Sequence, residues 1–235
     1  MIIQDIKERT SKISYQGLVM MFVGLLFLFF AGLMFLFLGP IKPTIEYFLY
    51  KHPFAYLGIL LPGLIAYILL AFFRTKINNM VLFILMPIVV VYFSFTISVT
   101  IVDKVSFQNG DNLFWMGAIL TTPALIIFVA GIIGYFELVN LQKLSTLTFF
   151  LFIPFVLLVI LNIFIRSSLM FNAITVIGIL LISASSVFTI NQIKKEQAFY
   201  QYATFKEMWK SGLFKAYDLF IDYVLLLSYI LRFSK

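Results

Sequence analysis

Two carboxylates, Asp218 and Asp222, lie one helical turn apart inside the last long apolar stretch of the chain, residues 214–233. A carboxylate surrounded by hydrocarbon must be paired, hydrated or protonated, so an acid in such a stretch is a candidate for an ion or proton site. On a helix both side chains share one face with Tyr229 and Arg232. We expect that face to look toward neighbouring helices rather than toward lipid.

The pair suits two kinds of chemistry. A carboxyl group removed from water takes up a proton more readily, and a second carboxyl nearby strengthens this tendency because double ionisation is disfavoured. Carboxylate, hydroxyl and carbonyl oxygens are also the ligands that Ca²⁺ accepts. The predicted Ca²⁺ site is weak and transient, because no segment of the sequence resembles an EF-hand loop.

The two acids differ in depth. Asp218 lies close to the start of its stretch, where solvation among lipid headgroups explains it as well as a function does. Asp222 lies deeper, about 12 Å along the axis at about 1.5 Å per residue, and we expect it to carry the function. Arg74, at the end of the second apolar stretch, is a candidate counter-charge to Asp222 if the two helices meet.

The composition places these acids in a membrane protein. Of 235 residues, 63% are hydrophobic, 11% are charged and 29 are Phe, which is more apolar surface than a water-soluble domain can bury. Seven stretches approach the ~20 apolar residues that cross a bilayer. They lack the alternation of barrel strands, so we expect helices. The prediction is an all-α integral membrane protein, a single transmembrane domain over residues 1–235, with spans at about 14–39, 54–73, 80–102, 112–136, 144–165, 169–190 and 214–233.

Several classes of chemistry are excluded by what the sequence lacks. There is no cysteine, and the one histidine, His52, lies in a polar connection where a solvated residue is expected. The sequence has no Gly-rich phosphate loop, no Ser/His/Asp set and no HExxH motif. We therefore expect no enzymatic activity, no resident metal and no cofactor.

The basic residues predict the orientation. A cytoplasmic N-terminus places 11 of the 17 basic residues inside, as the positive-inside rule favours, and seven spans then place the C-terminus outside. The net charge of +7 needs no nucleic acid to explain it. The first apolar stretch exceeds the ~7–15 residues of a signal-peptide core, so we expect it to remain as an anchor. The residues placed inside are Lys7, Arg9, Lys12, Arg74, Lys76, Lys143, Lys194, Lys195, Lys206, Lys210 and Lys215.

Small residues predict where helices approach closely, because helices in lipid gain from van der Waals contact. In the first stretch Gly17, Gly24 and Ala31 recur every seven residues, and in the fourth Ala130 and Gly134 form a small-xxx-small pair. Residues 183–186 make the sixth stretch small and polar near its end. This segment suits either tight packing or a hydrated pathway.

The longest polar segment, residues 191–212, has two interpretations. Its lysines favour a cytoplasmic connector, in part an amphipathic helix on the headgroups with Phe199, Tyr202, Phe205 and Trp209 on the membrane side. The same mixture of aromatic and basic residues also suits a docking surface for another membrane protein.

Three C-terminal motifs follow in an order that resembles one known family. They are residues 134–141 (GYFELVNL), residues 187–194 (VFTINQIK) and residues 219–223 (LFIDY) running to Arg232. Together they are similar to the ends of the fourth, sixth and seventh spans of the Bax inhibitor-1 (transmembrane BAX inhibitor motif) family. The motifs cover residues 112–235, and the rest of the chain agrees only in its number of spans.

The resemblance implies a seven-helix bundle around a central last helix, and a proton-sensitive Ca²⁺ leak in the plasma membrane of a bacterium. In that family an aspartate ending the sixth span pairs with one in the seventh. Here Asp222 occupies the second position, but Thr189 occupies the first. Threonine can hydrogen-bond to Asp222 but cannot carry a second negative charge, which removes the usual shared-proton switch.

Two functions follow as hypotheses. The first is a proton-influenced Ca²⁺ or cation leak with Asp222, Asp218 and Thr189 along the ion pathway. The alternative is a non-conducting membrane protein that modulates another membrane protein, such as a quality-control protease. A proton-coupled transporter has less support, because the two halves of the chain show no clear repeat.

Overall fold

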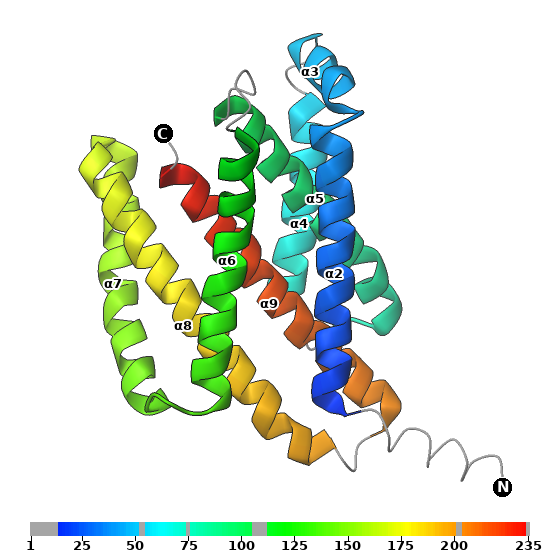
Figure 1. The fold of residues 1–235 in the computed structure, drawn as a ribbon, viewed down its shortest axis with the longest axis vertical. Helices are drawn as coiled ribbons and strands as arrows, with labels where there is room; N and C mark the ends of the chain where they lie inside the picture. Colours follow the sequence, from blue (N-terminus) through cyan, green and yellow to red (C-terminus); the bar gives the residue numbers. More distant parts are fainter. Residues whose placement is uncertain (1–13, 52–54, 74–75, 105–111, 201–203, 234–235) are drawn as a thin grey trace, which may run out of the picture. The chain divides into compact units, whose positions relative to one another are not determined.

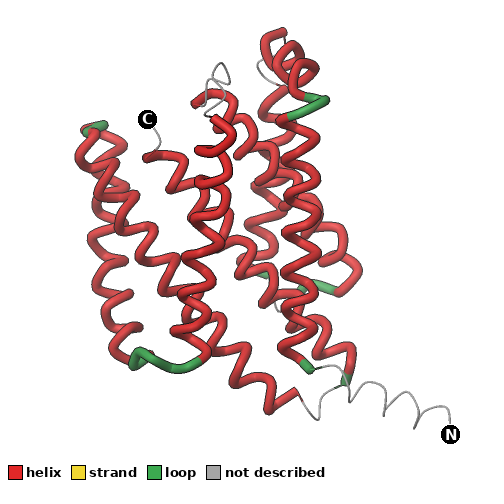
Figure 2. Tube along the Cα trace, in the orientation of Figure 1, coloured by secondary structure: helices red, strands yellow, loops and turns green. Residues whose placement is uncertain are grey.

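Helices make up nearly all of the chain that the structure describes, which is residues 14–51, 55–73, 76–104, 112–200 and 204–233 of a computed structural model. Within these ranges there is no β-strand, so the predicted all-α class is confirmed (Figure 2). His52 and Arg74 lie outside the described residues. The helices are α2 (Tyr15–Leu38), α3 (Lys42–Lys51), α4 (Ala55–Phe72), α5 (Asn79–Lys104), α6 (Asn112–Tyr135), α7 (Leu141–Ile165), α8 (Ser168–Tyr200) and α9 (Phe205–Phe233).

Five of the described helices are long and apolar enough to cross a membrane, which supports the predicted membrane class. They are α2, α5, α6, α7 and α8, and α4 contributes a shorter apolar helix over Leu61–Phe72. Helix α9 is less apolar because it carries Asp218, Asp222 and Arg232. Each of the seven predicted stretches coincides with a helix, and α3 is an additional short helix between the first two.

The chain divides into two compact units. Unit 1 comprises residues 1–23 and 111–235, and within it α6, α8 and α9 pack on one another while α7 packs on α8 (Figure 1). Unit 2 comprises residues 24–110, in which α4 packs on α5. In unit 2 the Ser98 hydroxyl donates to the Met34 sulfur at 3.1 Å, which joins α5 to α2.

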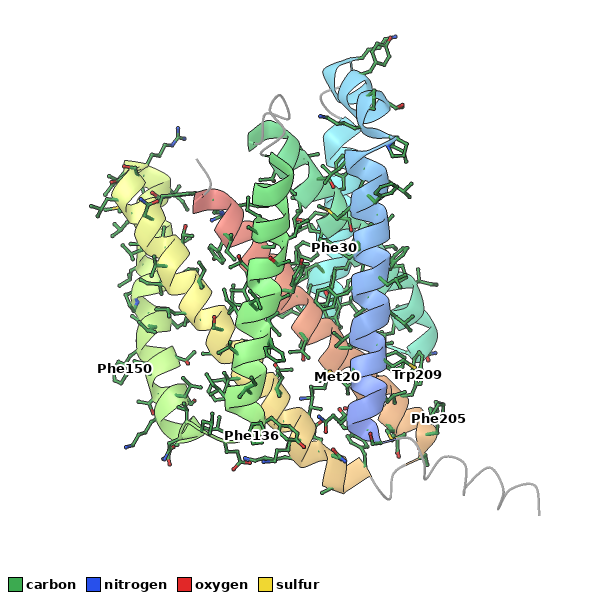
Figure 3. The ribbon with its side chains drawn as sticks, viewed as in Figure 1. Met20, Phe30, Phe136, Phe150, Phe205 and Trp209 are labelled. Carbon is green, nitrogen blue, oxygen red and sulfur yellow. The ribbon has the colours of Figure 1, made fainter. Side chains whose placement is uncertain are left out.

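Helices α7 and α9 of unit 1 contrast in burial. Every residue of α7 is described and none is buried, and Figure 3 shows Phe150 on its outer side. On α9, in contrast, Phe220, Leu226 and Leu227 are fully buried. Helix α7 is thus the least buried of the five long apolar helices, while the helix that carries the two acids is shielded by protein, which is where a buried polar group is tolerable.

Local sequence signals define the ends of these helices. Helix α9 begins with a capping box, in which the Thr204 amide donates to the Glu207 carboxylate at 3.1 Å. The side chain of Asn140 caps α7 by accepting from two backbone amides. Helix α6 ends with Glu137 in the left-handed region at φ 53°, and the Leu138 amide donates back to the Ile133 carbonyl.

Most of the segment 191–212, expected to be a connector that is in part an amphipathic helix, is helical, but it lengthens two long helices instead of forming a separate one. Residues 191–200 continue α8 and residues 205–212 are the first turns of α9. The helices extend because their polar side chains find partners on other helices. Trp209, expected on the membrane side, packs edge-to-face on Phe22 with ring centroids 5.1 Å apart (Figure 3). Phe199 and Phe205 are exposed, and Tyr202 lies outside the described residues.

The small-residue prediction fails for α2 and holds for α6. Gly17, Gly24 and Ala31 are exposed, because the first turns of α2 pack through large side chains instead, Tyr15, Leu18, Val19 and Phe22. In α6, however, Ala130 and Gly134 are both buried. A Cβ on Gly134 would lie 2.5 Å from the Val187 carbonyl oxygen of α8, so these two backbones approach as closely as glycine allows.

Candidate functional site

Asp222 is buried between α9 and α8, with 6% of its surface exposed. The Ser186 hydroxyl of α8 donates to its Oδ2 at 2.9 Å, and Ser186 itself is fully buried. The same hydroxyl lies 3.2 Å from the Ile182 carbonyl oxygen, one turn back on α8. Ser186 therefore has two acceptors within reach, the acid across the helix interface and its own backbone.

Thr189 and Asp218 surround this pair but take different positions from those predicted. Thr189 is buried on α8, three residues after Ser186, and among the described residues no hydrogen bond joins it to Asp222. Asp218 is half-buried one turn before Asp222, close enough for the two charges to interact. The hydroxyl of Ser185 is a further neighbour of Asp222. The partner of the acid is thus Ser186.

A cluster of five polar and aromatic residues, here called the Tyr15 cluster, lies where α2 and α9 begin and α8 ends. The Tyr15 hydroxyl donates to Glu196 Oε2 and lies 2.9 Å from the Ser211 oxygen as well. The Lys215 ammonium is 3.2 Å from Glu196 Oε1 and donates to Gln192 Oε1 at 2.6 Å. Sequence reasoning missed this cluster, because its members come from three helices with no common motif.

The Tyr15 cluster continues toward Asp222 along one face of α9. Lys215, Asp218 and Asp222 are separated by three and four residues, so their side chains follow one another on the same side of the helix. The rise from Lys215 to Asp222 is about 10 Å at about 1.5 Å per residue. We call these three residues, with Ser186, the polar file.

A second polar contact ties the end of α6 to α8. The Asn191 amide group donates to the Gly134 carbonyl at 3.0 Å, and the Lys194 ammonium is 3.2 Å from Glu137 Oε1. Glu137 lies in the exposed connection after α6, and the hydrogen bond and charge of Lys194 lower the pKa of its carboxyl below the usual value. Gly134 and Asn191 belong to the predicted family motifs, and here they position α6 against α8.

From Tyr223 onward, α9 contacts its neighbouring helices through aromatic side chains. The Tyr223 hydroxyl donates to the Leu120 carbonyl of α6 at 3.0 Å. The Tyr229 ring packs against Gly178 of α8, where an added Cβ would lie 2.6 Å from the ring. Arg232 stacks over the Tyr229 ring at 5.1 Å, about 15 Å along α9 from Asp222 at about 1.5 Å per residue. Arg232 shares the predicted face but lies far from the acid.

The donor set of the site suits passing cations more than a resident metal. In the described part of the chain no three His, Asp or Glu side chains lie together as a metal site would require. The polar file supplies carboxylate and hydroxyl oxygens, which are hard ligands, but far fewer than the six to eight that Ca²⁺ takes in a stable site.

Comparisons with known proteins return nothing for this chain. No protein-family model matches it, and neither a curated protein nor a solved structure matches it.

Proposed function

We propose that this protein is a cation leak of the membrane, with Ca²⁺ as the favoured ion and Asp222 as the acid that controls passage. The observation that carries the proposal is the buried hydrogen bond from Ser186 on α8 to Asp222 on α9. A buried carboxylate costs free energy unless it is paired, and among the described residues the groups that face Asp222 as donors are neutral hydroxyls, Ser186 at 2.9 Å and the neighbouring Ser185. Such an acid is suited to exchange a proton or a cation.

The two acceptors of Ser186 supply a physical basis for gating. While Asp222 is ionised, its carboxylate is the stronger acceptor, and the hydroxyl ties α8 to α9. Once Asp222 is protonated, it becomes a donor and a weaker acceptor, and Ser186 can return to the Ile182 carbonyl at 3.2 Å. Protonation therefore loosens the contact between the two helices, and the proposed pathway runs along that contact.

The Tyr15 cluster forms the proposed cytoplasmic entrance. Six lysines lie where α7 and α9 begin or where α8 ends, which by the positive-inside rule favours this end as the cytoplasmic one. Lys215 lies at the start of the polar file, held by Glu196. Its tethered ammonium occupies the position that an entering cation would take. The lysines are Lys143, Lys194, Lys195, Lys206, Lys210 and Lys215.

The same proposal includes the family, the topology and the location of the protein. The motifs around Gly134, Asn191 and Asp222 support a divergent member of the Bax inhibitor-1 family, with seven spans around a central last helix. A bacterial plasma membrane, a cytoplasmic N-terminus and an external C-terminus follow from that assignment. In this chain Ser186 takes over the hydrogen bond for which Thr189 was expected, so gating depends on one titrating acid rather than on a pair that shares a proton.

Reconstitution in liposomes tests the proposal. Ca²⁺ entry is measured with a trapped indicator for the wild type and for Asp222→Asn, which removes the charge at constant shape. Glu207→Gln is the matched control, since it removes an exposed carboxylate from the same helix and a glutamine preserves the capping box. We expect Asp222→Asn to change the entry rate several-fold and Glu207→Gln to leave it unchanged. Equal rates in all three proteins would remove Asp222 from the mechanism.

A second candidate function has one specific observation in its favour. Phe199 at the end of α8 and Phe205 at the start of α9 are 74% and 44% exposed, and the exposed Lys206 follows Phe205 in the sequence. We propose this surface as the docking site if the protein modulates another membrane protein. Crosslinking from position 206 in native membranes should then recover one reproducible partner, which Phe199→Ser should abolish. Recovery of no constant partner would contradict this alternative.

A further inference from the structure

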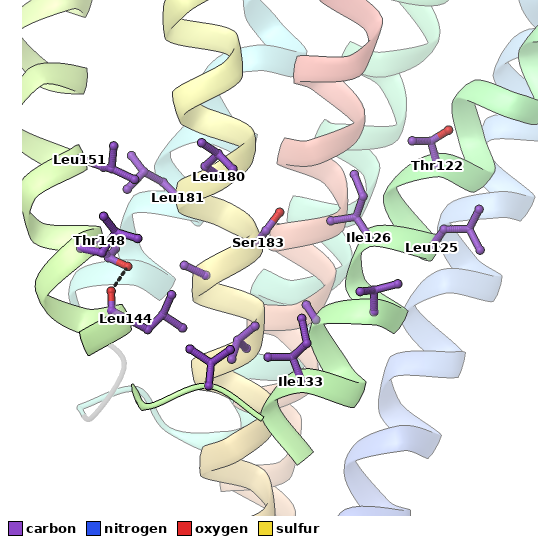
Figure 4. Close-up of a pocket in the computed structure, with 16 residues that line it drawn as sticks. Thr122, Leu125, Ile126, Ile133, Leu144, Thr148, Leu151, Leu180, Leu181 and Ser183 are labelled. Atoms are coloured by element: carbon purple, nitrogen blue, oxygen red, sulfur yellow. Dashed lines mark hydrogen bonds between the residues drawn. The ribbon is translucent and has the colours of Figure 1, made fainter. Parts of the chain in front are cut away.

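A groove of about 540 Å³ lies between α6, α7 and α8 in unit 1, away from the polar file (Figure 4). Its volume falls within the ~300–1,000 Å³ typical of small-molecule sites. Its walls are formed by aliphatic side chains, among them Ile126 and Ile133 of α6, Leu144 and Leu151 of α7, and Leu180 and Ala184 of α8. The groove forms because α7 rests on α8 without burying any of its own residues.

The hydroxyl groups in the groove are already engaged. Thr122 donates to the Ala118 carbonyl at 2.7 Å, and Ser183 donates to the Ile179 carbonyl at 2.7 Å. Figure 4 shows the third bond, from Thr148 to the Leu144 carbonyl at 2.8 Å. Since each hydroxyl satisfies its own helix backbone, the groove offers a ligand little beyond apolar contact. Such walls favour a hydrocarbon chain as the occupant.

The groove extends over one half of the bilayer. On α6 it runs from Thr122 to Ile133, and it reaches Val139 in the connection between α6 and α7. Eleven residues of helix rise about 16 Å, close to half of the ~30 Å hydrocarbon core. The groove thus matches the depth of one leaflet, the leaflet on the side where α7 begins.

The mouth of the groove is positively charged. Lys143 adjoins the lining residue Leu144 in the first turn of α7, and Lys194 and Lys195 lie on α8 close to Glu137. Three lysines against one glutamate leave an excess of positive charge at headgroup level. Basic clusters at this depth attract anionic lipid headgroups.

We propose that this groove binds an anionic phospholipid, with one acyl chain between α6, α7 and α8 and the headgroup beside Lys143 and Lys195. The acyl chain fills the space that the side chains of α7 leave open, so the lipid is part of the packing that holds α7 in place. The site is separate from the polar file, and it stands whether or not the protein conducts ions.

Photocrosslinking in liposomes tests the site. The probes are phosphatidylglycerol and phosphatidylcholine that carry the same diazirine-labelled acyl chain, and labelled peptides are identified by mass spectrometry. We expect phosphatidylglycerol to label residues 122–133 and 144–151 several-fold more than phosphatidylcholine does. Unlabelled phosphatidylglycerol should compete in the wild-type protein, and phosphatidylcholine should not.

Two pairs of variants distinguish the contribution of the lipid's acyl chain to binding from that of its headgroup. Ala184→Phe fills the groove and should reduce labelling several-fold, whereas Ala124→Phe, at an exposed position outside it, should not. Lys143→Gln with Lys195→Gln should remove the preference for phosphatidylglycerol, and Lys206→Gln should preserve it.

Three results would overturn the proposal. Equal labelling by both lipids together with no effect of Ala184→Phe would show ordinary boundary lipid. Equal labelling by a free diazirine fatty acid that phosphatidylglycerol does not displace would show that the headgroup plays no part. Should Ala184→Phe fail to fold, the competition in the wild-type protein decides, and competition by both lipids alike would overturn the proposal.

Discussion

The hydrogen bond between Ser186 and Asp222 makes a quantitative prediction. Ser186→Ala removes the donor, and Asp222→Leu removes the acceptor at similar volume. A hydrogen bond to an ionised group contributes about 1.5–3 kcal/mol to stability, and one between neutral groups contributes about 0.5–1.5 kcal/mol. In the Asp222→Leu background the Ser186 hydroxyl can still donate to the Ile182 carbonyl oxygen, which lies 3.2 Å away. Ser186→Ala should therefore destabilise that background less than it destabilises the wild type. We expect the double-mutant cycle to give a coupling of about 1–3 kcal/mol at neutral or higher pH.

The coupling should also depend on pH. As the pH falls and Asp222 becomes protonated, the charge-assisted part of the hydrogen bond disappears and the coupling should decrease toward about 0.5–1.5 kcal/mol. The assay is reversible unfolding of the four proteins in the same detergent micelles, followed by circular dichroism. A coupling below about 0.5 kcal/mol at every pH, the level expected of independent sites, would refute the assigned interaction. A coupling of constant size would refute the titration of Asp222.

Further predictions concern the scaffold and the entrance. Gly134→Ala should destabilise the protein by about 1–3 kcal/mol, because the new Cβ overlaps the backbone of α8, whereas Gly24→Ala in open space should stabilise it by about 0.5–1 kcal/mol. Thermal unfolding of both variants checks this, and a neutral Gly134→Ala would contradict the close approach. Arg166 caps α7 at φ 51°, so Arg166→Gly should raise stability by about 0.5–1 kcal/mol in the same assay. Lys215→Met removes the tethered ammonium beside Glu196 and should raise Ca²⁺ entry into liposomes; lower entry would contradict a blocking role for Lys215.

The helices of unit 1 show what sequence patterns can predict. Apolar runs long enough for a bilayer specify α6, α7 and α8, because a chain in lipid must satisfy its backbone within itself. The extension of α8 to Tyr200 was not predictable from the same pattern. It depends on Glu196, whose partners Tyr15 and Lys215 lie on helices distant in sequence. Hydropathy locates the spans, but not the polar contacts that continue a helix beyond them.

For the candidate site, the sequence predicted the acid but not its hydrogen-bond partner. An acid within the last apolar stretch was enough to single out Asp222, since such a group must be shielded. Its partner was expected at Thr189 from the family motif, but the helix period also places Ser186 on the same face of α8. The choice between two hydroxyls three residues apart depends on how α8 and α9 cross. The Tyr229 ring of α9 packs on Gly178 of α8, and the close approach of Gly134 on α6 to Val187 positions α8 itself. Neither contact can be calculated from local sequence.

The pH profile of Ca²⁺ entry is the most direct test of the central claim that one buried acid controls passage. Wild-type protein, Asp222→Asn and Glu207→Gln are reconstituted at equal density, and entry is recorded across a series of pH values on the Tyr15 cluster side. We expect a clear transition in the wild type and in Glu207→Gln, and a flat profile for Asp222→Asn. An unchanged transition in Asp222→Asn would show that another group controls the leak.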